Sequence, residues 1–269
     1  MTLADREWRL VREESWDGPL NMALDEIAAE TAANGGPRTL RVYRWDPSTL
    51  SLGYRQEPET VDWEFCEDEG ITVTRRPTGG GGIYHDNYGD ISYSIIAPAD
   101  ELPGNLMETY ELLCEPIFDA FERMGVDAGF TEEKLPVIHQ PACYLRELHP
   151  AHDIVANGRK ISGNAQYRRK DAVIQHGSLK FALDAKRHLS TFANPETTAA
   201  QFHERVTTIN EEVSIDRADA VTAVEEALHD WADAPDGEWT DDEVARAREH
   251  AKAKFESEPW TQRHEDPTA

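Results

Sequence analysis

Four consecutive glycines, at positions 79–82, separate two segments that both have the pattern of β-strands. Residues 71–76 and residues 91–96 are rich in β-branched and aromatic side chains and are bounded by turn residues. Because glycines carry no side-chain bulk, the backbone N–H groups of such a loop can approach a ligand closely. No Gly-Lys-Ser/Thr follows the run, and it does not have the Gly-x-Gly-x-x-Gly spacing. The sequence therefore predicts a strand–loop–strand unit that is neither a P-loop nor a dinucleotide-binding turn.

Further strands and helices surround this unit. Asn157-Gly158 is a strong signal for a two-residue hairpin between two of the strands. We expect strands at 39–45, 51–54 (continuing the same sheet), 153–156, 159–162 and 172–181, and helices at 21–30, 106–124, 217–231 and 240–255. This order predicts an α+β fold, with a mixed β-sheet and flanking helices. We expect a single catalytic-type domain over residues 1–262, with a helical part over about 214–262 and a flexible tail at 263–269.

The charge of the chain is strongly acidic. Asp and Glu number 52 against 27 Lys and Arg, which gives a net charge of -25. Such a surface repels itself, but at ~1 M salt the Debye length falls to ~3 Å and the repulsion is screened. The composition therefore indicates a halophilic protein. It also argues against nucleic acid as a partner, because no basic stripe is present to neutralise phosphates.

The sequence offers no membrane segment. No apolar run approaches the ~20 residues that cross a bilayer, and the charged N-terminal stretch lacks the apolar centre of a signal peptide. We expect a cytoplasmic protein without membrane contact.

The three cysteines, Cys66, Cys114 and Cys143, lie far apart and are odd in number. They have neither the CxxC spacing of a zinc site nor the pairing of a disulfide framework. The default interpretation of Cys66 and Cys114 is a small buried apolar residue. Cys143 is a stronger candidate for chemistry, for the reason given below.

Charged residues near the glycine run and in the 159–162 strand are candidates for a site. Arg75 and Arg76 precede the glycines, and a guanidinium matches the geometry of phosphate or carboxylate. Lys160 is one of only seven lysines and is followed by the small residues Ser162, Gly163 and Ala165, which leave space around it. His176 beside Gly177 is by itself as consistent with a structural role as with a functional one.

Several segments, in order, resemble the lipoate-protein ligase A family of the biotin/lipoate protein ligase superfamily. They lie at positions 21–26, 44–56, 75–86, 158–166 and 175–179, together with Asp153. The resemblance is specific from about residue 21 to residue 184. It implies a catalytic domain like those of class II aminoacyl-tRNA synthetases and biotin protein ligases. Combined with the acidic charge, it suggests a haloarchaeal source.

The resemblance implies an ATP-dependent ligase. Lipoate (or octanoate) and ATP would form acyl-AMP, and a lysine of a lipoyl carrier domain, either a 2-oxoacid dehydrogenase E2 or a glycine cleavage H protein, would then attack it. Lys160 would stabilise the developing negative charge, and Asp153 would hold Mg²⁺ near the phosphates. The implied substrate- and ATP-binding residues are Arg75, Arg76, Thr78, Gly79, Gly80, Gly81, Gly82, Tyr84, His85, Asp90, Asp153, Ser162, Gly163, Ala165, His176 and Gly177.

The segment around Cys143 supports an alternative. It resembles that of cofactor-free octanoyl and lipoyl transferases, which carry the acyl group as a thioester on such a cysteine and use no ATP. The charge of Lys160 would favour the nucleophilic thiolate. However, transferases usually have Thr-Gly-Gly-Arg where this chain has Thr78 and four glycines, whereas ligases differ only by an alanine at Gly82. The ligase is therefore the preferred prediction and the Cys143 transferase the alternative.

Two further expectations concern partners. A non-catalytic protein that only captures carrier domains is a second alternative, but it would not need Lys160 and the glycine loop together. Two-domain ligases carry an accessory domain, whereas only about 55 residues follow Ser214 here. The ligase prediction therefore includes a separate small accessory subunit.

Overall fold

The computed structural model describes residues 6–148 and 152–268 of the chain. Its main element is a seven-stranded sheet in the order β1-β2-β6-β10-β9-β8-β7. β1 and β2 are parallel, and the other neighbouring strands are antiparallel. The strands are β1 (Trp8–Trp16), β2 (Arg38–Trp45), β6 (Asp90–Pro98), β10 (Ala172–Lys180), β9 (Arg159–Arg168), β8 (Asp153–Ala156) and β7 (Ala128–Phe130).

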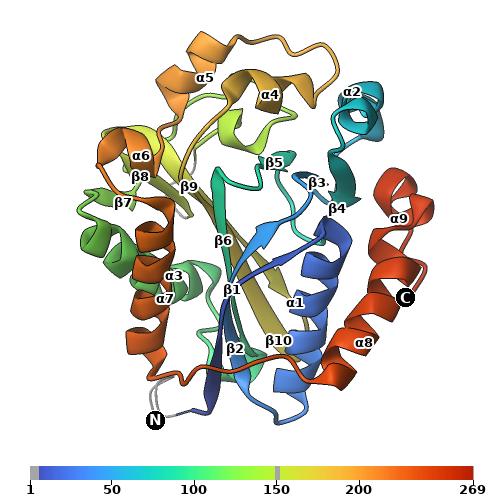
Figure 1. Cartoon of the computed structure of the whole chain (residues 1–269), viewed down its shortest axis with the longest axis vertical. Helices are drawn as coiled ribbons and strands as arrows, with labels where there is room; N and C mark the ends of the chain where they lie inside the picture. The colour runs from blue at the N-terminus through green and yellow to red at the C-terminus, as the bar shows by residue number, and fades with distance from the viewer. Residues whose placement is uncertain (1–5, 149–151, 269) are drawn as a thin grey trace.

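A smaller sheet of three strands lies near one end of the large sheet (Figure 1). Its order is β4-β3-β5, with β3 (Thr49–Leu52) parallel to β4 (Thr72–Arg75) and antiparallel to β5 (Ile83–His85). The expectation that residues 51–54 continue the large sheet is therefore wrong. The turn after β2 carries the chain into a separate sheet, and the glycine run connects two strands of that sheet.

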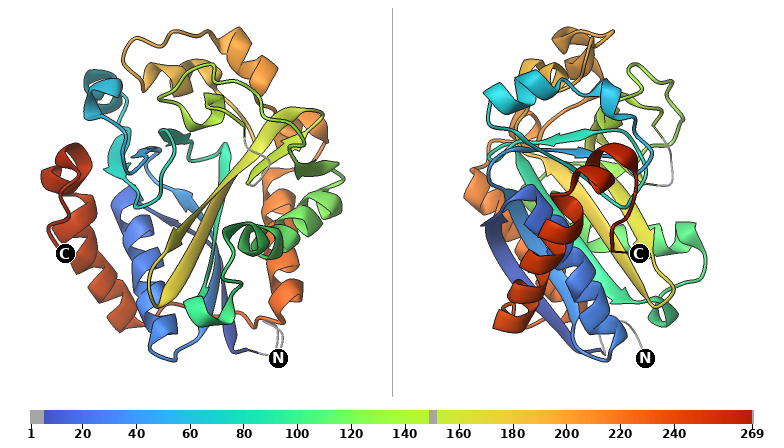
Figure 2. Two further views of the ribbon diagram at one scale, coloured as in Figure 1. Left: turned by 180° about the vertical axis from the view of Figure 1, so that it is seen from behind. Right: turned by 90° about the vertical axis from the view of Figure 1, so that its right-hand side faces the viewer.

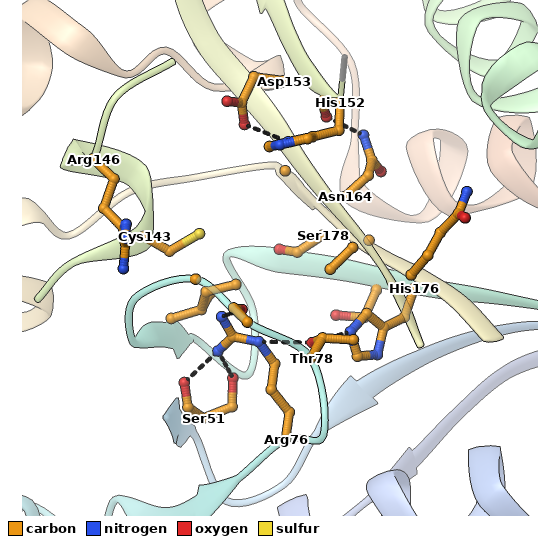
Figure 3. A pocket seen from close by; sticks show the side chains of 18 of the residues that line it. Ser51, Arg76, Thr78, Cys143, Arg146, His152, Asp153, Asn164, His176 and Ser178 are labelled. Carbon is orange, nitrogen blue, oxygen red and sulfur yellow. Dashed lines mark hydrogen bonds and ion pairs between the residues drawn. The ribbon is translucent and has the colours of Figure 1, made fainter. Parts of the chain in front are cut away.

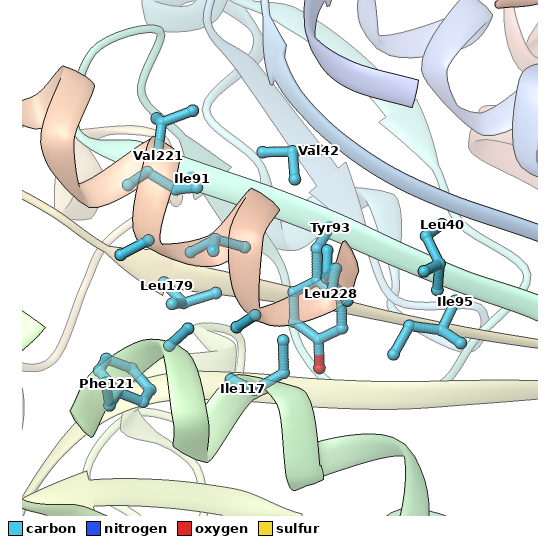
Figure 4. Close-up of a cluster of buried hydrophobic side chains, with 14 of the residues drawn as sticks. Leu40, Val42, Ile91, Tyr93, Ile95, Ile117, Phe121, Leu179, Val221 and Leu228 are labelled. Atoms are coloured by element: carbon cyan, nitrogen blue, oxygen red, sulfur yellow. The ribbon is translucent and has the colours of Figure 1, made fainter. Parts of the chain in front are cut away.

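Helices cover both faces of the large sheet (Figures 1 and 2). α3 (Leu106–Met124) and α7 (Arg217–Ala232) lie on one face, and α1 (Gly18–Ala33) lies on the other, with α8 (Asp241–His250) packed against α1. Aliphatic side chains of β2, β6 and β10 meet those of α3 and α7 in the main core (Figure 4). Members of this core are Leu40, Val42, Ile91, Leu179, Ile117, Phe121, Val221 and Leu228. The predicted α+β fold is confirmed.

The helix predicted over 106–124 is confirmed as α3, and its ends have clear causes. The Asn105 side chain accepts a hydrogen bond from the Met107 N–H at the N-terminus. At the C-terminus Gly125 takes φ 80°, a left-handed conformation that stops the helix and that glycine adopts without strain.

The C-terminal part differs from the prediction. Thr240 and Glu243 form the predicted capping box at the start of α8. The regular helix ends at His250, however, and continues as the π-helical turn η5 (Ala251–Phe255), and a further helix, α9 (Glu258–Arg263), follows it. α9 packs against β4, so the end of the chain lies next to the small sheet.

Shorter elements complete the chain. α4, α5 and the loop containing η4 lie together beyond the small sheet (Figure 2). Their bounds, and those of the other short elements, are η2 (Pro58–Thr60), α2 (Trp63–Asp68), η3 (Ala99–Glu101), η4 (Cys143–Leu145), α4 (Ala185–Ser190), α5 (Ala199–Arg205) and α6 (Ile209–Glu212). Among residues 6–148 and 152–268, no helix combines the length and the apolar character needed to cross a membrane.

We expect the melting temperature to rise as KCl is increased into the molar range. The net charge is -25, and even carboxylates that pair with an arginine, such as Asp236 and Asp242, have exposed fractions of 64% and 79%, so the excess negative charge repels itself through solvent. At ~1 M salt the screening length is only ~3 Å, which removes most of this repulsion. Thermal melts followed by circular dichroism at low and molar KCl measure the effect. A melting temperature that stays flat or falls would contradict it.

Candidate active site

A cavity of about 620 Å³ opens between the small sheet, the segment 137–147 and the strands β8, β9 and β10 (Figure 3). Polar side chains from all three regions point into it. The charged and nucleophilic residues among them include Ser51, Arg76, Thr78, His85, Cys143, Arg146, His152, Asp153, Lys160 and His176. The cavity therefore collects residues that are more than 100 positions apart in the sequence.

Arg76 holds the glycine loop in its conformation. Its Nη2 donates to the carbonyls of Gly79 and Gly81, at 2.7 Å in both cases. Its Nε donates to Thr78 Oγ1 at 3.1 Å, and its Nη1 donates to the Ser51 carbonyl at 2.8 Å. The guanidinium is buried, so its hydrogen-bonding capacity is used largely to shape the loop.

The glycine loop is in direct contact with the segment that carries Cys143. The Gly82 N–H donates to the Pro141 carbonyl at 2.6 Å, and the Cys143 N–H donates to the Gly82 carbonyl at 2.9 Å. A Cβ at Gly81 would lie 2.4 Å from the Pro141 carbonyl oxygen and 2.8 Å from the Cys143 nitrogen. No side chain fits there on this backbone. Gly80 takes φ 96°, and a Cβ on it would lie 3.7 Å from Cys143 Sγ.

Cys143 is the cysteine that faces the cavity. It is partly exposed, whereas Cys66 and Cys114 are buried. Burial raises the pKa of Cys66 and of Cys114 to about 12, so both stay as thiols near neutral pH. Their default interpretation as small buried residues agrees with this environment.

Lys160 forms a buried ion pair at the other side of the cavity. Its Nζ lies 2.6 Å from Asp153 Oδ1, and both side chains are only 3% exposed. Burial by itself would lower the pKa of Lys160. The attraction of Asp153, and to a smaller extent of Cys143, outweighs this effect, so the pKa of Lys160 is raised. Burial likewise opposes the charge of Asp153, but Lys160 holds its pKa well below the usual range. Lys160 is therefore a fixed positive charge within electrostatic reach of Cys143. A Cβ on Gly163 would lie 3.3 Å from the Lys160 Nζ, so this glycine leaves room for the ammonium group.

A chain of hydrogen bonds next to the glycine loop links Ser51, His85 and Asp90. Ser51 Oγ lies 2.9 Å from His85 Nε2, and His85 Nδ1 lies 2.6 Å from Asp90 Oδ2. Lys180 Nζ donates to Asp90 Oδ1 at 2.5 Å, and the Trp45 ring stacks on His85 at 4.1 Å. Burial, only partly offset by Asp90, lowers the pKa of His85 to about 4. A general base works best with a pKa near the working pH. We therefore assign this imidazole a structural role, as the hydrogen-bonded link between Ser51 and Asp90.

His176 contacts the glycine loop from β10. Its Nε2 lies 2.9 Å from Thr78 Oγ1, and its Nδ1 lies 3.8 Å from Asp25 Oδ2. Next to it, a Cβ on Gly177 would lie 2.3 Å from Asn164 Oδ1, so the glycine permits Asn164 to turn into the cavity.

The structure brings most of the predicted site residues together. Those that line the cavity are Arg76, Thr78, Gly79, Gly80, His85, Cys143, Asp153, Lys160, Gly163, Ala165, His176 and Gly177. Those outside its lining are Arg75, Gly81, Gly82, Tyr84, Asp90 and Ser162. Gly81 and Gly82 pack against the Cys143 segment, and Asp90 contacts the cavity residues His85 and Ser178 from behind. The Tyr84 hydroxyl bonds to Asp86 and Arg187 instead.

Arg75 does not line the cavity, where an anionic ligand was expected to contact it, and its guanidinium binds backbone carbonyls instead. Its side chain is fully buried and donates to the carbonyls of Gly53, Tyr54 and Gln56 at 2.7–2.9 Å. It also donates to the Trp260 and Thr261 carbonyls of α9. Burial lowers the pKa of Arg75 to about 10. Arg75 thus ties the C-terminal helix to the base of the glycine loop.

Several cavity residues were not predicted from the sequence, among them Ser51, Arg146, His152 and Asn164. Ser51 lies within the family-like segment 44–56, in which no single residue was assigned a role, Arg146 lies outside these segments, and His152 precedes Asp153. Asn164 lies within the predicted 158–166 motif and is four positions from Lys160. Even-numbered spacing along a strand places side chains on one face, so the position of Asn164 relative to Lys160 could have indicated it as a cavity residue.

The residues around Asp153 do not fit a Mg²⁺ site. Asp153 Oδ1 is bonded to the Lys160 ammonium group. Over the described ranges 6–148 and 152–268, no three acidic, histidine or cysteine side chains come together as metal ligands. Mg²⁺ prefers several oxygen ligands, and this carboxylate, already paired with Lys160, does not supply them.

Comparisons with known sequences point in one direction. A family model, the lipoyl protein ligase A/B catalytic domain, matches residues 17–229. Octanoyltransferase LipM of Anoxybacillus flavithermus is 33% identical over 275 residues, covering 94% of this chain and 97% of that protein. LipM of Geobacillus kaustophilus is 32% identical and covers 96% and 99%. LipM of Bacillus subtilis is 32% identical and covers 76% and 78%. These sources do not support a haloarchaeal origin of this chain.

Comparisons with solved structures give the same fold. A Thermoplasma acidophilum protein assigned as a lipoate protein ligase, solved with bound lipoic acid, has a TM-score of 0.77 and 25% identity. It covers 95% of this chain and 99% of its own. A lipoate-protein ligase A bound with ATP has a TM-score of 0.77 and 26% identity and covers 95% and 98%.

The prediction of an ATP-dependent ligase is wrong. The relatives at 32–33% identity that match this chain along almost its whole length are octanoyltransferases, whereas the two ligase structures are only 25–26% identical. The ligase prediction gave too much weight to the glycine loop. Within that loop, Gly81 has no room for a side chain because the Cys143 segment packs against it.

Proposed function

Because the chain belongs to the lipoyl protein ligase A/B catalytic domain family, we propose that it is an octanoyltransferase that uses no ATP. An octanoyl group would pass through a thioester on Cys143 to a lysine of a lipoyl carrier domain. The observation that carries this proposal is that Cys143 lines the same cavity as the buried ammonium group of Lys160. The transferase relatives support it.

In the first step the Cys143 thiolate attacks the carbonyl carbon of an octanoyl thioester donor. A new carbon–sulfur bond forms, the bond to the donor sulfur breaks, and the donor leaves as a thiolate that takes up a proton. Negative charge develops on the carbonyl oxygen during the attack. Lys160 is a charge already held in place by Asp153, so it stabilises this oxygen without reorganisation.

In the second step the amine of a carrier lysine attacks the thioester on Cys143. An amide bond forms, the carbon–sulfur bond breaks, and Cys143 leaves as a thiolate. One proton is released from the attacking nitrogen. Lys160 stays protonated throughout, because its raised pKa keeps the ammonium form, and the same charge favours the departing thiolate.

The cavity also has an apolar part that suits a medium-length acyl chain. Met22, Tyr43, Trp45 and Ile83 line it together with the polar residues of the reacting end. A volume of about 620 Å³ is in the range of small-molecule sites that are largely apolar with a few polar groups. We therefore place the acyl chain against these side chains.

The carrier partner would be an E2 lipoyl domain or a glycine cleavage H protein. A Thermoplasma acidophilum ligase with this fold is described together with its E2 lipoyl domain, as a bi-partite enzyme. This chain forms no acyl adenylate in the proposed reaction, so an accessory subunit that shelters one is not required.

The test compares two acyl sources with a purified lipoyl domain. Octanoyl acyl carrier protein should octanoylate the domain without nucleotide, and intact-protein mass spectrometry should detect an octanoyl thioester on Cys143. Free octanoate or lipoate with Mg-ATP should give no product. Product formation that requires ATP and releases pyrophosphate would overturn the proposal. The matched control is Cys66→Ser, which removes a buried thiol outside the cavity.

A further inference from the structure

Tyr144 directly follows Cys143 in the short helix η4 and is fully buried. Two ammonium groups lie over its ring. Lys160 Nζ is 5.0 Å from the ring centroid, and Lys180 Nζ is 4.8 Å from it. A cation over an aromatic face is attracted by the negative charge of that face, and the attraction is strongest where water is excluded. Tyr144 is therefore held by two buried charges.

Each of these lysines is fixed by its own carboxylate. Lys160 Nζ lies 2.6 Å from Asp153, and Lys180 Nζ lies 2.5 Å from Asp90. The two pairs belong to neighbouring strands, with Lys160 on β9 and Lys180 on β10. The two ammonium groups are therefore held in place by the large sheet, and their contacts fix the position of the Tyr144 ring relative to that sheet.

The Tyr144 hydroxyl adds a directional contact. It lies 3.1 Å from the Ser178 carbonyl and 3.3 Å from Ser178 Oγ, and donates its proton in this direction. Ser178 Oγ in turn donates to Asp90 Oδ2 at 2.8 Å. Burial raises the pKa of Tyr144 well above its usual value, so the hydroxyl remains a donor.

These contacts fix Cys143 from one side, and the glycine loop fixes it from the other. The Cys143 N–H is bonded to the Gly82 carbonyl, and the next residue along the chain is anchored over Lys160. Lys160 is the charge that the reaction needs close to the sulfur. One side chain, Tyr144, therefore links the nucleophile to its stabilising cation.

We propose that Tyr144 is a positioning residue that holds the Cys143 sulfur in register with Lys160 through its two cation–π contacts. This proposal rests on the proposed function, in which Cys143 is the nucleophile. It predicts that the electron density of the ring at position 144 controls the reactivity of Cys143, and that the hydroxyl contributes less.

The experiment replaces Tyr144 with phenylalanine and then with phenylalanines carrying one, two and three ring fluorines. Fluorination weakens the negative face of the ring while almost preserving its shape. The readout is the rate at which iodoacetamide alkylates Cys143 near neutral pH, with Cys66→Ser and Cys114→Ser in the background. A second readout is kcat and KM with the octanoyl thioester of N-acetylcysteamine.

We expect Tyr144→Phe to stay within a few fold of the parent. Along the fluorine series the alkylation rate and kcat should fall stepwise, by roughly tenfold in all, with little change in KM. The same series at Phe121, in the core away from the cavity, should leave the alkylation rate unchanged. Rates that are flat along the Tyr144 series, or that fall equally for Phe121, would overturn the proposal.

The outcome is separable from the proposed function. If the parent chain forms no octanoyl thioester on Cys143, the proposed function fails. The alkylation series still reports whether Tyr144 controls the sulfur, because it needs no acyl donor.

Discussion

Replacement of Cys143 by alanine will abolish octanoyl transfer to a lipoyl domain. Without the sulfur no acyl-enzyme can form. The carrier amine would then have to attack the donor directly, in one step that is harder than either of the two steps through the thioester. Removal of the nucleophile from an enzyme that works through a covalent intermediate costs roughly 10⁴-fold or more in kcat. The measurement is the initial rate of octanoylated lipoyl domain formed from octanoyl acyl carrier protein.

The fold should survive this change, because Cys143 is partly exposed and the η4 segment is held by backbone bonds and by Tyr144. Cys114→Ala is the matched control. It deletes a buried thiol in α3, and its effect should be on stability, with the rate of transfer retained at a temperature below its melting point. A Cys143→Ala variant with more than a tenth of the parent rate would exclude the thioester route.

Replacement of Lys160 by methionine will slow acylation of Cys143 by roughly 10²–10³-fold, the usual cost of removing one preorganised oxyanion-stabilising group. Methionine has a similar length but no charge. The measurement is a single-turnover experiment that follows octanoyl-Cys143 by rapid quench and mass spectrometry, so that binding and chemistry are separated.

This variant also breaks a buried ion pair. Asp153 then loses the ammonium group at 2.6 Å, and breaking such a pair costs about 3–5 kcal/mol of stability. The double variant Lys160→Met/Asp153→Asn removes both charges and should recover much of the lost stability. Because it still lacks the cation, it should remain as slow as the single variant. Acylation near the parent rate in a folded double variant would show that Lys160 serves only the fold.

The glycine loop shows how a sequence pattern can mislead. The loop free of side chains favoured a ligase, since transferases usually place an arginine there. In the structure Gly81 meets the Pro141 carbonyl and the Cys143 N–H so closely that no Cβ fits. The glycine at position 81 thus reflects packing against the cysteine segment, and by itself it does not indicate nucleotide binding.

Local signals in the sequence determined the elements whose contacts are local. The amphipathic pattern and the Asn105 and Gly125 caps defined α3, and Asn157-Gly158 defined the turn between β8 and β9. The small residues around Lys160 were also visible in the sequence, because strand neighbours such as Gly163 affect space within a few positions of the lysine.

Only the tertiary structure decided which of two adjacent arginines serves the cavity. Successive side chains of a strand point to opposite sides, so Arg75 and Arg76 had to diverge, but the sequence does not say which way. The direction follows from α9, whose Trp260 and Thr261 carbonyls surround Arg75 from nearly 190 positions away. Contacts between separate segments also bring Cys143 to the glycine loop and Tyr144 over Lys160. They depend on how the two sheets pack together, which local patterning does not encode.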